Sequence, residues 1–193
     1  MLIFGYGSLV HVEHLQRYLG RDLVHSNDFM FCQLKNFCRC WTAAMDNRIN
    51  VPGYKYYVEK HTGHRPDGVV TFLNIRPCKG KNITGIIFNV SKEELIRLDQ
   101  REQNYRKIDV TAMIDAPVSE KVYAYIGLNE SERRYHEGLR RQNAMISQEY
   151  YDLVYGAYAS LGKDALVDYV DTTEQPQIPI VHLEKRQIPD VSP

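Results

Sequence analysis

The sequence predicts an α+β fold, and two kinds of apolar pattern along its 193 residues support that prediction. Short apolar or alternating runs, many of them rich in β-branched residues, occur at 2–4, 69–75, 83–90 and 122–126, where we expect strands. Apolar residues at helical spacing occur at 9–19, 91–102 and 147–161. Turn residues separate these segments, and neither an internal repeat nor a linker interrupts them. The sequence therefore predicts a single domain over residues 1–193.

Composition excludes several classes of protein. The 24 Lys and Arg residues balance the 24 Asp and Glu residues, which argues against a nucleic-acid partner. No apolar run approaches the length of a membrane span, and Met1 leads directly into the first strand rather than into a signal peptide. We therefore expect a cytoplasmic protein that contacts neither nucleic acid nor membrane.

The four cysteines, Cys32, Cys38, Cys40 and Cys78, lack the paired C-x-x-C spacing of a metal site. We expect free thiols and no bound metal. The histidines favour the same interpretation, because the pairs His11/His14 and His61/His64 come without a third ligand.

The first nine residues, M-L-I-F-G-Y-G-S-L, predict a strand, a glycine turn and the start of a helix that stops at Gly20. We expect Ser8 to cap this helix. Backbone N–H groups gather at such a helix start and can receive an anion, and the two glycines allow a ligand to approach closely. A tight connector that binds no ligand is the alternative. Ser8 lacks the G-x-S-x-G setting of a nucleophile, and G-Y-G lacks the third glycine of a dinucleotide site.

The next part of the chain is rich in predicted strands. A long or broken strand is expected over 29–44, followed by an irregular loop over 46–67 that is a candidate cover for a site. Residues 69–75 and 83–90 read as two strands, and the turn residues at 77–81 predict a hairpin between them.

The clearest helix is predicted over 91–102, where Ser91 and Glu94 form a capping box. Glu102 follows Leu98 by four residues, so it shares the apolar face of the helix, whereas Asp99 turns partly aside. Burial and the negative end of the helix dipole both disfavour the charged form of this carboxyl group, which suits a group that exchanges a proton near neutral pH. The alternative is an ordinary ion pair of Glu102 with Arg101, Arg106 or Lys107.

The remaining segments are simpler. Alternation predicts strands over 105–116 and 122–126, and the charged stretch 129–141 is expected to be a solvated helix or a linker. Further helices are predicted over 147–162 and 164–170. One face of the first should carry Tyr151, Val154, Tyr155, Tyr158 and Leu161. The extended tail from Thr172 should pack against the body through Ile178, Ile180, Val181 and Leu183.

Two of these stretches together resemble a known family. F-G-Y-G-S-L at 4–9, followed by L-D-Q-R-E-x-x-Y at 98–105, resembles the γ-glutamylcyclotransferase superfamily, which includes AIG2-like and glutathione-degrading branches. The resemblance covers about residues 1–128 and leaves a helical part at 129–193. It implies a small mixed β-barrel with helices packed outside. It also implies a reaction in which the α-amine of a γ-glutamyl group attacks its own γ-carbonyl and releases 5-oxoproline and an amine.

The resemblance also implies roles for individual residues. Tyr6, Gly7, Ser8 and Leu9 match the substrate-binding loop, Glu102 matches the catalytic acid/base, and Tyr105 and Tyr125 fall near tyrosines that line the pocket. The implied substrate is a small γ-glutamyl amine or peptide, and no cofactor or metal is implied. The 46–67 loop and the C-terminal helices match no particular branch, so the amine part of the substrate stays open. Two alternatives also stay open: a catalytically silent binding protein of the same fold, and an acyltransferase that uses the same pocket.

Overall fold

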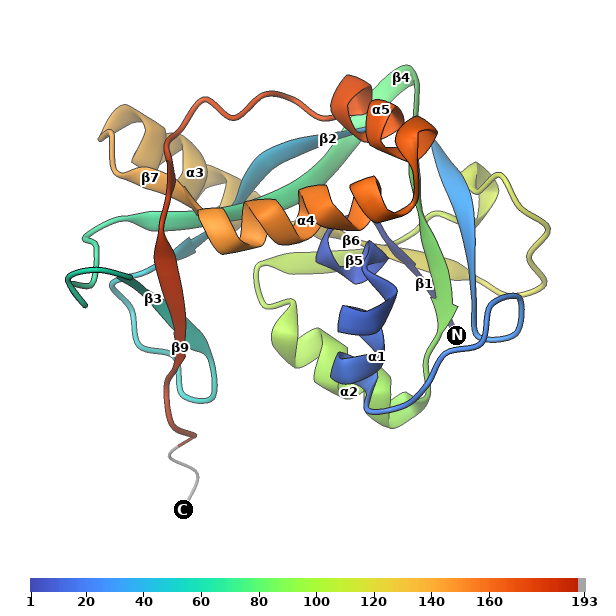
Figure 1. The fold of residues 1–193 in the computed structure, drawn as a ribbon, viewed down its shortest axis with the longest axis horizontal. Helices are drawn as coiled ribbons and strands as arrows, with labels where there is room; N and C mark the ends of the chain where they lie inside the picture. Colours follow the sequence, from blue (N-terminus) through green and yellow to red (C-terminus); the bar gives the residue numbers. More distant parts are fainter. Residues whose placement is uncertain (191–193) are drawn as a thin grey trace.

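The computed structural model describes residues 1–190 and has an α+β fold, which confirms the predicted class (Figure 1). Most strands of the described chain join one large mixed sheet in the order β5-β6-β1-β4-β7-β8, and β2 pairs with β4 outside this path. A separate small sheet pairs β3 with β9. The strands are β1 (Leu2–Gly5), β2 (Phe29–Asp46), β3 (Lys55–Glu59), β4 (Val69–Asn89), β5 (Tyr105–Asp109), β6 (Val122–Gly127), β7 (Ala144–Ser147), β8 (Ile180–Val181) and β9 (Leu183–Gln187).

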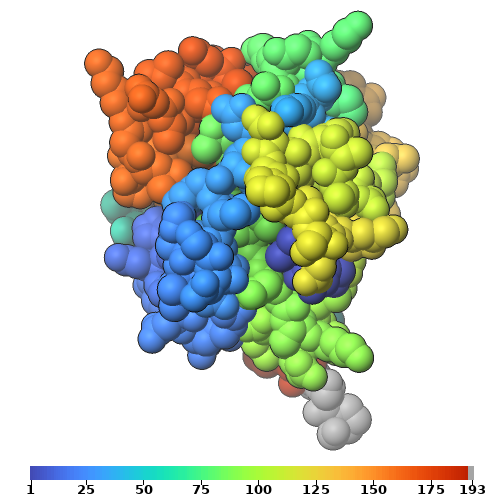
Figure 2. All heavy atoms as spheres, turned by 90° about the vertical axis from the view of Figure 1, so that its right-hand side faces the viewer, coloured from blue at the N-terminus to red at the C-terminus, as the bar shows by residue number. Residues whose placement is uncertain are grey.

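Five α-helices of the described chain surround the sheet: α1 (Val12–Leu19), α2 (Lys92–Arg101), α3 (Asn129–Arg140), α4 (Gln148–Ser160) and α5 (Lys163–Thr172). Two 3-10 turns, η1 (Ser8–Val10) and η2 (Thr111–Met113), complete the helical elements. In Figure 1, α1 and α2 lie on one side of the molecule, and β3 with β9 stands opposite them. Figure 2 shows the face away from β3 and β9, where α5, part of β2 and the segment between β5 and β6 form the surface. No helix of residues 1–190 is long and apolar enough to cross a membrane.

The strand pairing neither shows nor excludes the predicted closed barrel. The pairs of residues 1–190 place β5 and β8 at the two ends of the sheet path. The closed barrel therefore stays a prediction. The main apolar core draws residues from both halves of the chain: Ile3 and Phe88 pack in the same cluster as Tyr158, Tyr169 and Ile178.

The predicted hairpin over 69–90 is wrong, because both halves belong to one long strand, β4. Each half pairs with β2 instead of with the other half: Ile83 lies opposite Leu34, and Ile75 lies opposite Arg39. The turn residues form an irregularity within the strand, where the register shifts and Gly80 takes a φ of 83°. Glycine tolerates this left-handed conformation, so the extra residues bulge without ending the pairing.

The predicted loop 46–67 contains a strand that the sequence analysis missed. Residues Lys55–Glu59 form β3, and their partner strand β9 comes from the far end of the chain. Both Tyr57 and Val58 are buried, so β3 lacks the alternation by which a half-buried strand is recognised.

The glycine turn at the N-terminus differs from the prediction in its cap. Ser8 begins the short turn η1, whereas His11 caps α1 and accepts the His14 N–H on its Nδ1 at 3.3 Å. The predicted stop at Gly20 is confirmed, with Gly20 in the left-handed conformation at φ 76°.

Other segments confirm or correct the remaining predictions. The capping box of α2 is present, and the tail packs back through the buried Ile178 and Leu183. The strand predicted over 105–116 ends at Asp109. The sequence analysis missed the short strand β7. The charged stretch 129–141 forms the helix α3, which is not wholly solvated because it buries Tyr135. On α4, Val154 and Tyr158 are buried as predicted, but Tyr155 is exposed. All four cysteines are free, and three of them are buried.

Candidate active site

A pocket opens where the N-terminal turn, the end of α2 and the start of β3 meet. It is lined by Phe4, Gly5, Tyr6, Gly7, Ser8, Leu9, Tyr54, Lys55, Phe72, Leu73, Arg101, Glu102, Asn104, Tyr105, Tyr125 and Tyr150. All seven residues that the sequence singled out for the site are in this set. The structure brings the seven side chains to one pocket, and their roles stay predictions. A pocket with apolar walls and a few convergent polar groups is typical of a small-molecule site.

The N-terminal turn forms one wall of the pocket. Val10 donates its N–H to the Gly7 carbonyl at 3.0 Å, so η1 starts directly after Gly7. The first N–H groups of such a turn have no acceptor within it, which leaves them available to a ligand. The Ser8 hydroxyl accepts a hydrogen bond from Nη2 of Arg101 at 2.9 Å, which ties the turn to the end of α2.

Close packing explains both glycines of this turn. A Cβ on Gly5 would lie 2.8 Å from Cβ of Leu9, which leaves no space for a side chain. A Cβ on Gly7 would lie 3.3 Å from the Tyr150 hydroxyl, on the pocket side. Neither glycine has a positive φ. At Gly5, lack of space is therefore what requires glycine.

Glu102 is the C-cap residue of α2, and its side chain is only 14% exposed. Its backbone is fixed on both sides, because its N–H donates to Leu98 and its carbonyl accepts from the N–H of Tyr105, each at 2.9 Å. Nε of Arg101 lies 3.4 Å from its carboxylate. The ion pair of Glu102 with Arg101, which the sequence analysis gave as the alternative, is therefore present, and both residues line the pocket.

Several tyrosines line the same pocket as this carboxylate. Tyr6 donates to the Tyr125 carbonyl at 2.6 Å, and Tyr105 donates to the Leu73 carbonyl at 2.8 Å. Burial is the main cause that raises the pKa of Tyr6 and Tyr105 well above the usual value, and the negative charge of Glu102 adds to it. These hydroxyls therefore stay protonated and hold the pocket walls in place.

Asp99 turns partly aside from the apolar face, as the helical spacing predicts, and its side chain is 43% exposed. Its carboxylate accepts the Tyr125 hydroxyl at 2.6 Å and pairs with Lys107 at 2.7 Å. Asp99 therefore supports a residue that lines the pocket, although it does not line the pocket itself.

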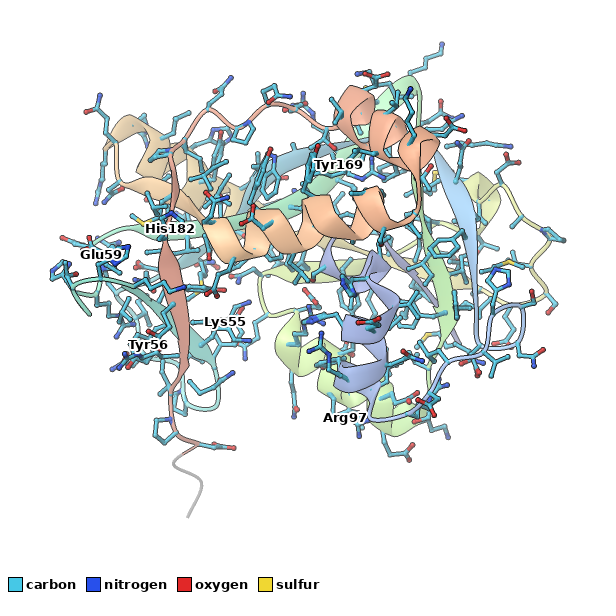
Figure 3. The ribbon with its side chains drawn as sticks, viewed as in Figure 1. Lys55, Tyr56, Glu59, Arg97, Tyr169 and His182 are labelled. Atoms are coloured by element: carbon cyan, nitrogen blue, oxygen red, sulfur yellow. The ribbon has the colours of Figure 1, made fainter. Side chains whose placement is uncertain are left out.

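Lys55 is a pocket residue that the sequence analysis missed. Its Nζ lies 4.2 Å from the ring centre of Phe72 and 5.4 Å from that of Tyr54. Its pKa is lowered to about 8, chiefly by burial; the charge of Glu102 opposes this shift, and the charge of Arg101 adds to it. Figure 3 shows Lys55 pointing from β3 toward α1 and α2, with Tyr56 on the other side of the strand. The sequence pointed to Lys55 only indirectly, because it lies in the irregular 46–67 loop that was a candidate cover for a site.

Arg39 supports the turn from behind and was also missed. It is fully buried on β2 and donates to the Thr172 hydroxyl at 2.5 Å, to the Tyr158 hydroxyl at 2.9 Å and to the Tyr6 carbonyl at 3.4 Å. The Tyr158 hydroxyl also lies 2.8 Å from the Tyr6 carbonyl. Residues of β2 and α4 therefore fix the backbone of the turn. Nothing in the local sequence around Arg39 indicates these partners.

Among residues 1–190, no group of three or more His, Cys, Asp or Glu side chains is arranged to hold a metal ion.

Comparison with known proteins identifies the family. The family model described as gamma-glutamyl cyclotransferase, AIG2-like, matches residues 3–153, which is most of the chain. The chain belongs to this family. A search of curated protein sequences gave no significant match.

Solved structures agree at the level of the fold. A structure named gamma-glutamyl cyclotransferase is similar to this chain with a TM-score of 0.55 and 14% identity, over 92% of this chain and 89% of that one. An uncharacterized protein from Homo sapiens is similar with a TM-score of 0.53 and 14% identity, over 91% of this chain and 89% of that one.

Proposed function

We propose that the protein releases 5-oxoproline from a small γ-glutamyl compound by intramolecular aminolysis, with Glu102 as the acid/base. The observation that carries this proposal is the largely buried Glu102 carboxylate in the same pocket as the 6–9 turn. Family membership supports the class of reaction.

The chemistry needs one group that first takes and then returns a proton. The α-amine nitrogen attacks the γ-carbonyl carbon, and the Glu102 carboxylate accepts a proton from that nitrogen as the new C–N bond forms. The carbonyl oxygen becomes negative, and N–H groups at the start of η1 stabilise it. The protonated Glu102 then donates to the leaving nitrogen, the original C–N bond breaks, and 5-oxoproline and the free amine depart.

The pocket is suited to hold the substrate in a folded conformation. Ring closure is intramolecular, so most of the acceleration comes from fixing the amine next to the carbonyl. Arg101 donates a hydrogen bond to Ser8 and forms an ion pair with Glu102, and it therefore links the turn to the acid/base. Lys55, on the opposite wall, supplies a positive charge for the substrate α-carboxylate.

The experiment is an assay for 5-oxoproline with glutathione, γ-glutamyl amino acids and γ-glutamylamines as substrates. We expect release from at least one compound and loss of release in Glu102→Gln. Glu93→Gln is the matched control, since Glu93 is an exposed carboxylate at the other end of the same helix. Binding without 5-oxoproline would favour the silent binding protein, and transfer of the γ-glutamyl group to an added amine would favour the acyltransferase.

A further inference from the structure

Strands β2 and β4 bring two free thiols together beside an irregularity in their pairing. Cys38 of β2 lies opposite Arg76 of β4, and Cys78 follows two residues further along β4. At that point the register shifts, so that residues 78–81 bulge opposite the single residue Asn36. Cys78 is therefore the first residue of the bulge, and its neighbour on β2 is Cys38.

The strand register places both thiols on one face of the sheet. Residues two apart on a strand share a face, so Cys78 lies on the face of Arg76, which is opposite Cys38. The two cysteines are thus diagonal neighbours across the antiparallel pair, an arrangement in which side chains can reach each other.

The pKa of the Cys38 thiol agrees with this arrangement. Burial is the largest cause and raises that pKa, the side chain of Arg76 lowers it, and the side chain of Cys78 raises it again. The last two effects are hydrogen-bonding interactions, which act over only a few ångströms. Both Arg76 and Cys78 therefore lie against the Cys38 sulfur.

An ion pair at the surface covers the two thiols. Arg76 pairs with Glu174, and the Cys38 thiol donates to Oε1 of Glu174 at 3.8 Å. The side chains of this ion pair are 58% and 41% exposed, respectively, and Cys78 is half-buried, whereas Cys38 is buried. A small molecule from solvent therefore reaches Cys78 first.

We propose that Cys38 and Cys78 form a reversible intramolecular disulfide when a peroxide reaches the bulge, with Arg76 as a residue that assists the attack by Cys38. None of these residues lines the pocket beside Glu102, so the proposal does not depend on the proposed function. The bond would tie β2 to β4 where the bulge interrupts their pairing.

The reaction has two steps. In the first, the Cys78 sulfur, as a thiolate, attacks one oxygen of hydrogen peroxide, and the O–O bond breaks. Cys78 becomes a sulfenic acid, two electrons pass from sulfur to oxygen, and the hydroxide that leaves takes up the thiol proton as water. In the second step, the Cys38 sulfur attacks the Cys78 sulfur, and the S–O bond breaks. The departing hydroxide takes the Cys38 proton, which gives the disulfide and a second water.

The bulge supplies the small movement that the bond requires. A disulfide needs Cβ atoms about 3.5 to 4.5 Å apart, which is closer than diagonal neighbours of a regular ladder. Residues 78–81 lie outside the regular pairing, and Gly80 in this segment has a φ of 83°. Cys78 can therefore approach Cys38 while β2 keeps its place.

Cys40 is the competing partner, because it lies on the same face of β2 as Cys38. Two residues apart on one strand, however, their Cβ atoms are about 6.6 Å from each other and point the same way, which is too far for a disulfide. The Cys40 sulfur instead contacts the Thr42 hydroxyl at 3.3 Å. We therefore expect Cys38 to pair with Cys78 alone.

The test treats the whole folded protein with a small excess of hydrogen peroxide near neutral pH, blocks the remaining thiols and digests the chain without reductant. Mass spectrometry should find the Cys38 peptide joined to the Cys78 peptide, and the number of free thiols should fall from four to two. Dithiothreitol should restore all four. A thermal melt before digestion checks that the treated protein is still folded.

Two variants make the test specific. Cys78→Ser should abolish the cross-link, whereas Cys32→Ser should form it as the wild type does, because Cys32 is a buried thiol of β2 far from the bulge. Four free thiols after treatment, over-oxidation of Cys78 without a cross-link, or a disulfide between two chains would overturn the proposal. So would a cross-link found only in protein that has lost its cooperative melt.

The role of Arg76 as a positioning residue has its own readout. Its positive charge favours the thiolate of Cys38, so Arg76→Gln should slow the second step and leave the sulfenic acid of Cys78 exposed to trapping for longer. With dimedone present during oxidation, the share of Cys78 trapped as the dimedone adduct should rise by roughly three- to tenfold relative to the wild type. Raising the pH should reduce this difference. An unchanged share would overturn this role of Arg76.

Discussion

Replacing Glu102 by glutamine is the sharpest perturbation of the proposed mechanism. Glutamine keeps the size of the side chain, and its amide oxygen can stay near Nε of Arg101, which lies 3.4 Å from the present carboxylate. The variant therefore keeps the geometry of the pocket but cannot carry a proton between the attacking and leaving nitrogens. Any loss of activity then reports on proton transfer.

The expected loss is large in kcat and small in KM. A positioned acid/base contributes about 10² to 10⁴ in rate, which corresponds to roughly 3 to 5 kcal/mol of transition-state stabilisation. KM should change little, because the turn and Lys55 would still bind the glutamyl end.

Stability should change much less than activity. The side chain is 14% exposed, so removing its charge relieves desolvation but also weakens the pairing of Arg101. We expect these opposing effects to leave the free energy of unfolding within about 1 kcal/mol of the wild type, a shift in Tm of at most roughly 4 °C.

The assay is 5-oxoproline release at saturating substrate, with a thermal melt of each protein as the folding check. Two controls accompany it. Glu93→Gln should keep wild-type kcat, and Asp99→Asn should keep substantial activity because its amide oxygen can still accept the Tyr125 hydroxyl. A Glu102→Gln protein that releases 5-oxoproline at the wild-type rate would refute the assignment of Glu102 as the acid/base.

Three further predictions follow from the pocket and its supports. Gly7→Val should raise KM steeply without unfolding the protein, because its added atoms point at the Tyr150 hydroxyl; an unchanged KM would contradict the role of the turn. Lys55 has a pKa of about 8 in the folded protein and a higher one when unfolded, so the unfolded chain binds more protons between about pH 8 and 10.5 and stability from this group rises with pH. Urea denaturation should show that rise in the wild type and a smaller one in Lys55→Met; equal rises would count against the burial of this amine. Arg39→Met should lower stability by about 3 to 5 kcal/mol, seen as a drop in Tm of roughly 6 to 20 °C, because it removes the buried ion-pair partner of Asp168 and the hydrogen bonds to the Tyr6 carbonyl and Thr172. A Tm within 2 °C of the wild type would show that Arg39 does not anchor the turn.

The sequence predicted features that depend on near neighbours. The capping box of Ser91 and Glu94, the stop at Gly20 and the position of Glu102 at the end of α2 all follow from residues within one or two helical turns. Spacing along a helix fixes which side chains share a face, so a carboxylate on the face of Leu98 could be recognised without the fold.

The predictions that failed concern partners distant in the chain. Residues 77–81 carry turn chemistry, yet β2 pairs with β4 on both sides of them and keeps the strand continuous. Ser8 has the chemistry of a cap, yet its hydroxyl receives Arg101 from the end of α2. In both cases a tertiary hydrogen bond replaced the local one that the sequence favours.

The sequence by itself determined the α+β class, the glycine turn and the carboxylate that faces it. Only the tertiary structure decided what completes and supports the pocket, namely Lys55 from the 46–67 segment and Arg39 behind the turn. Strand β3 finds its partner β9 at the other end of the chain, and that pairing holds Lys55 in the pocket wall. Such contacts join residues that are distant in the sequence, and no pattern of neighbouring residues predicts which distant segments will meet.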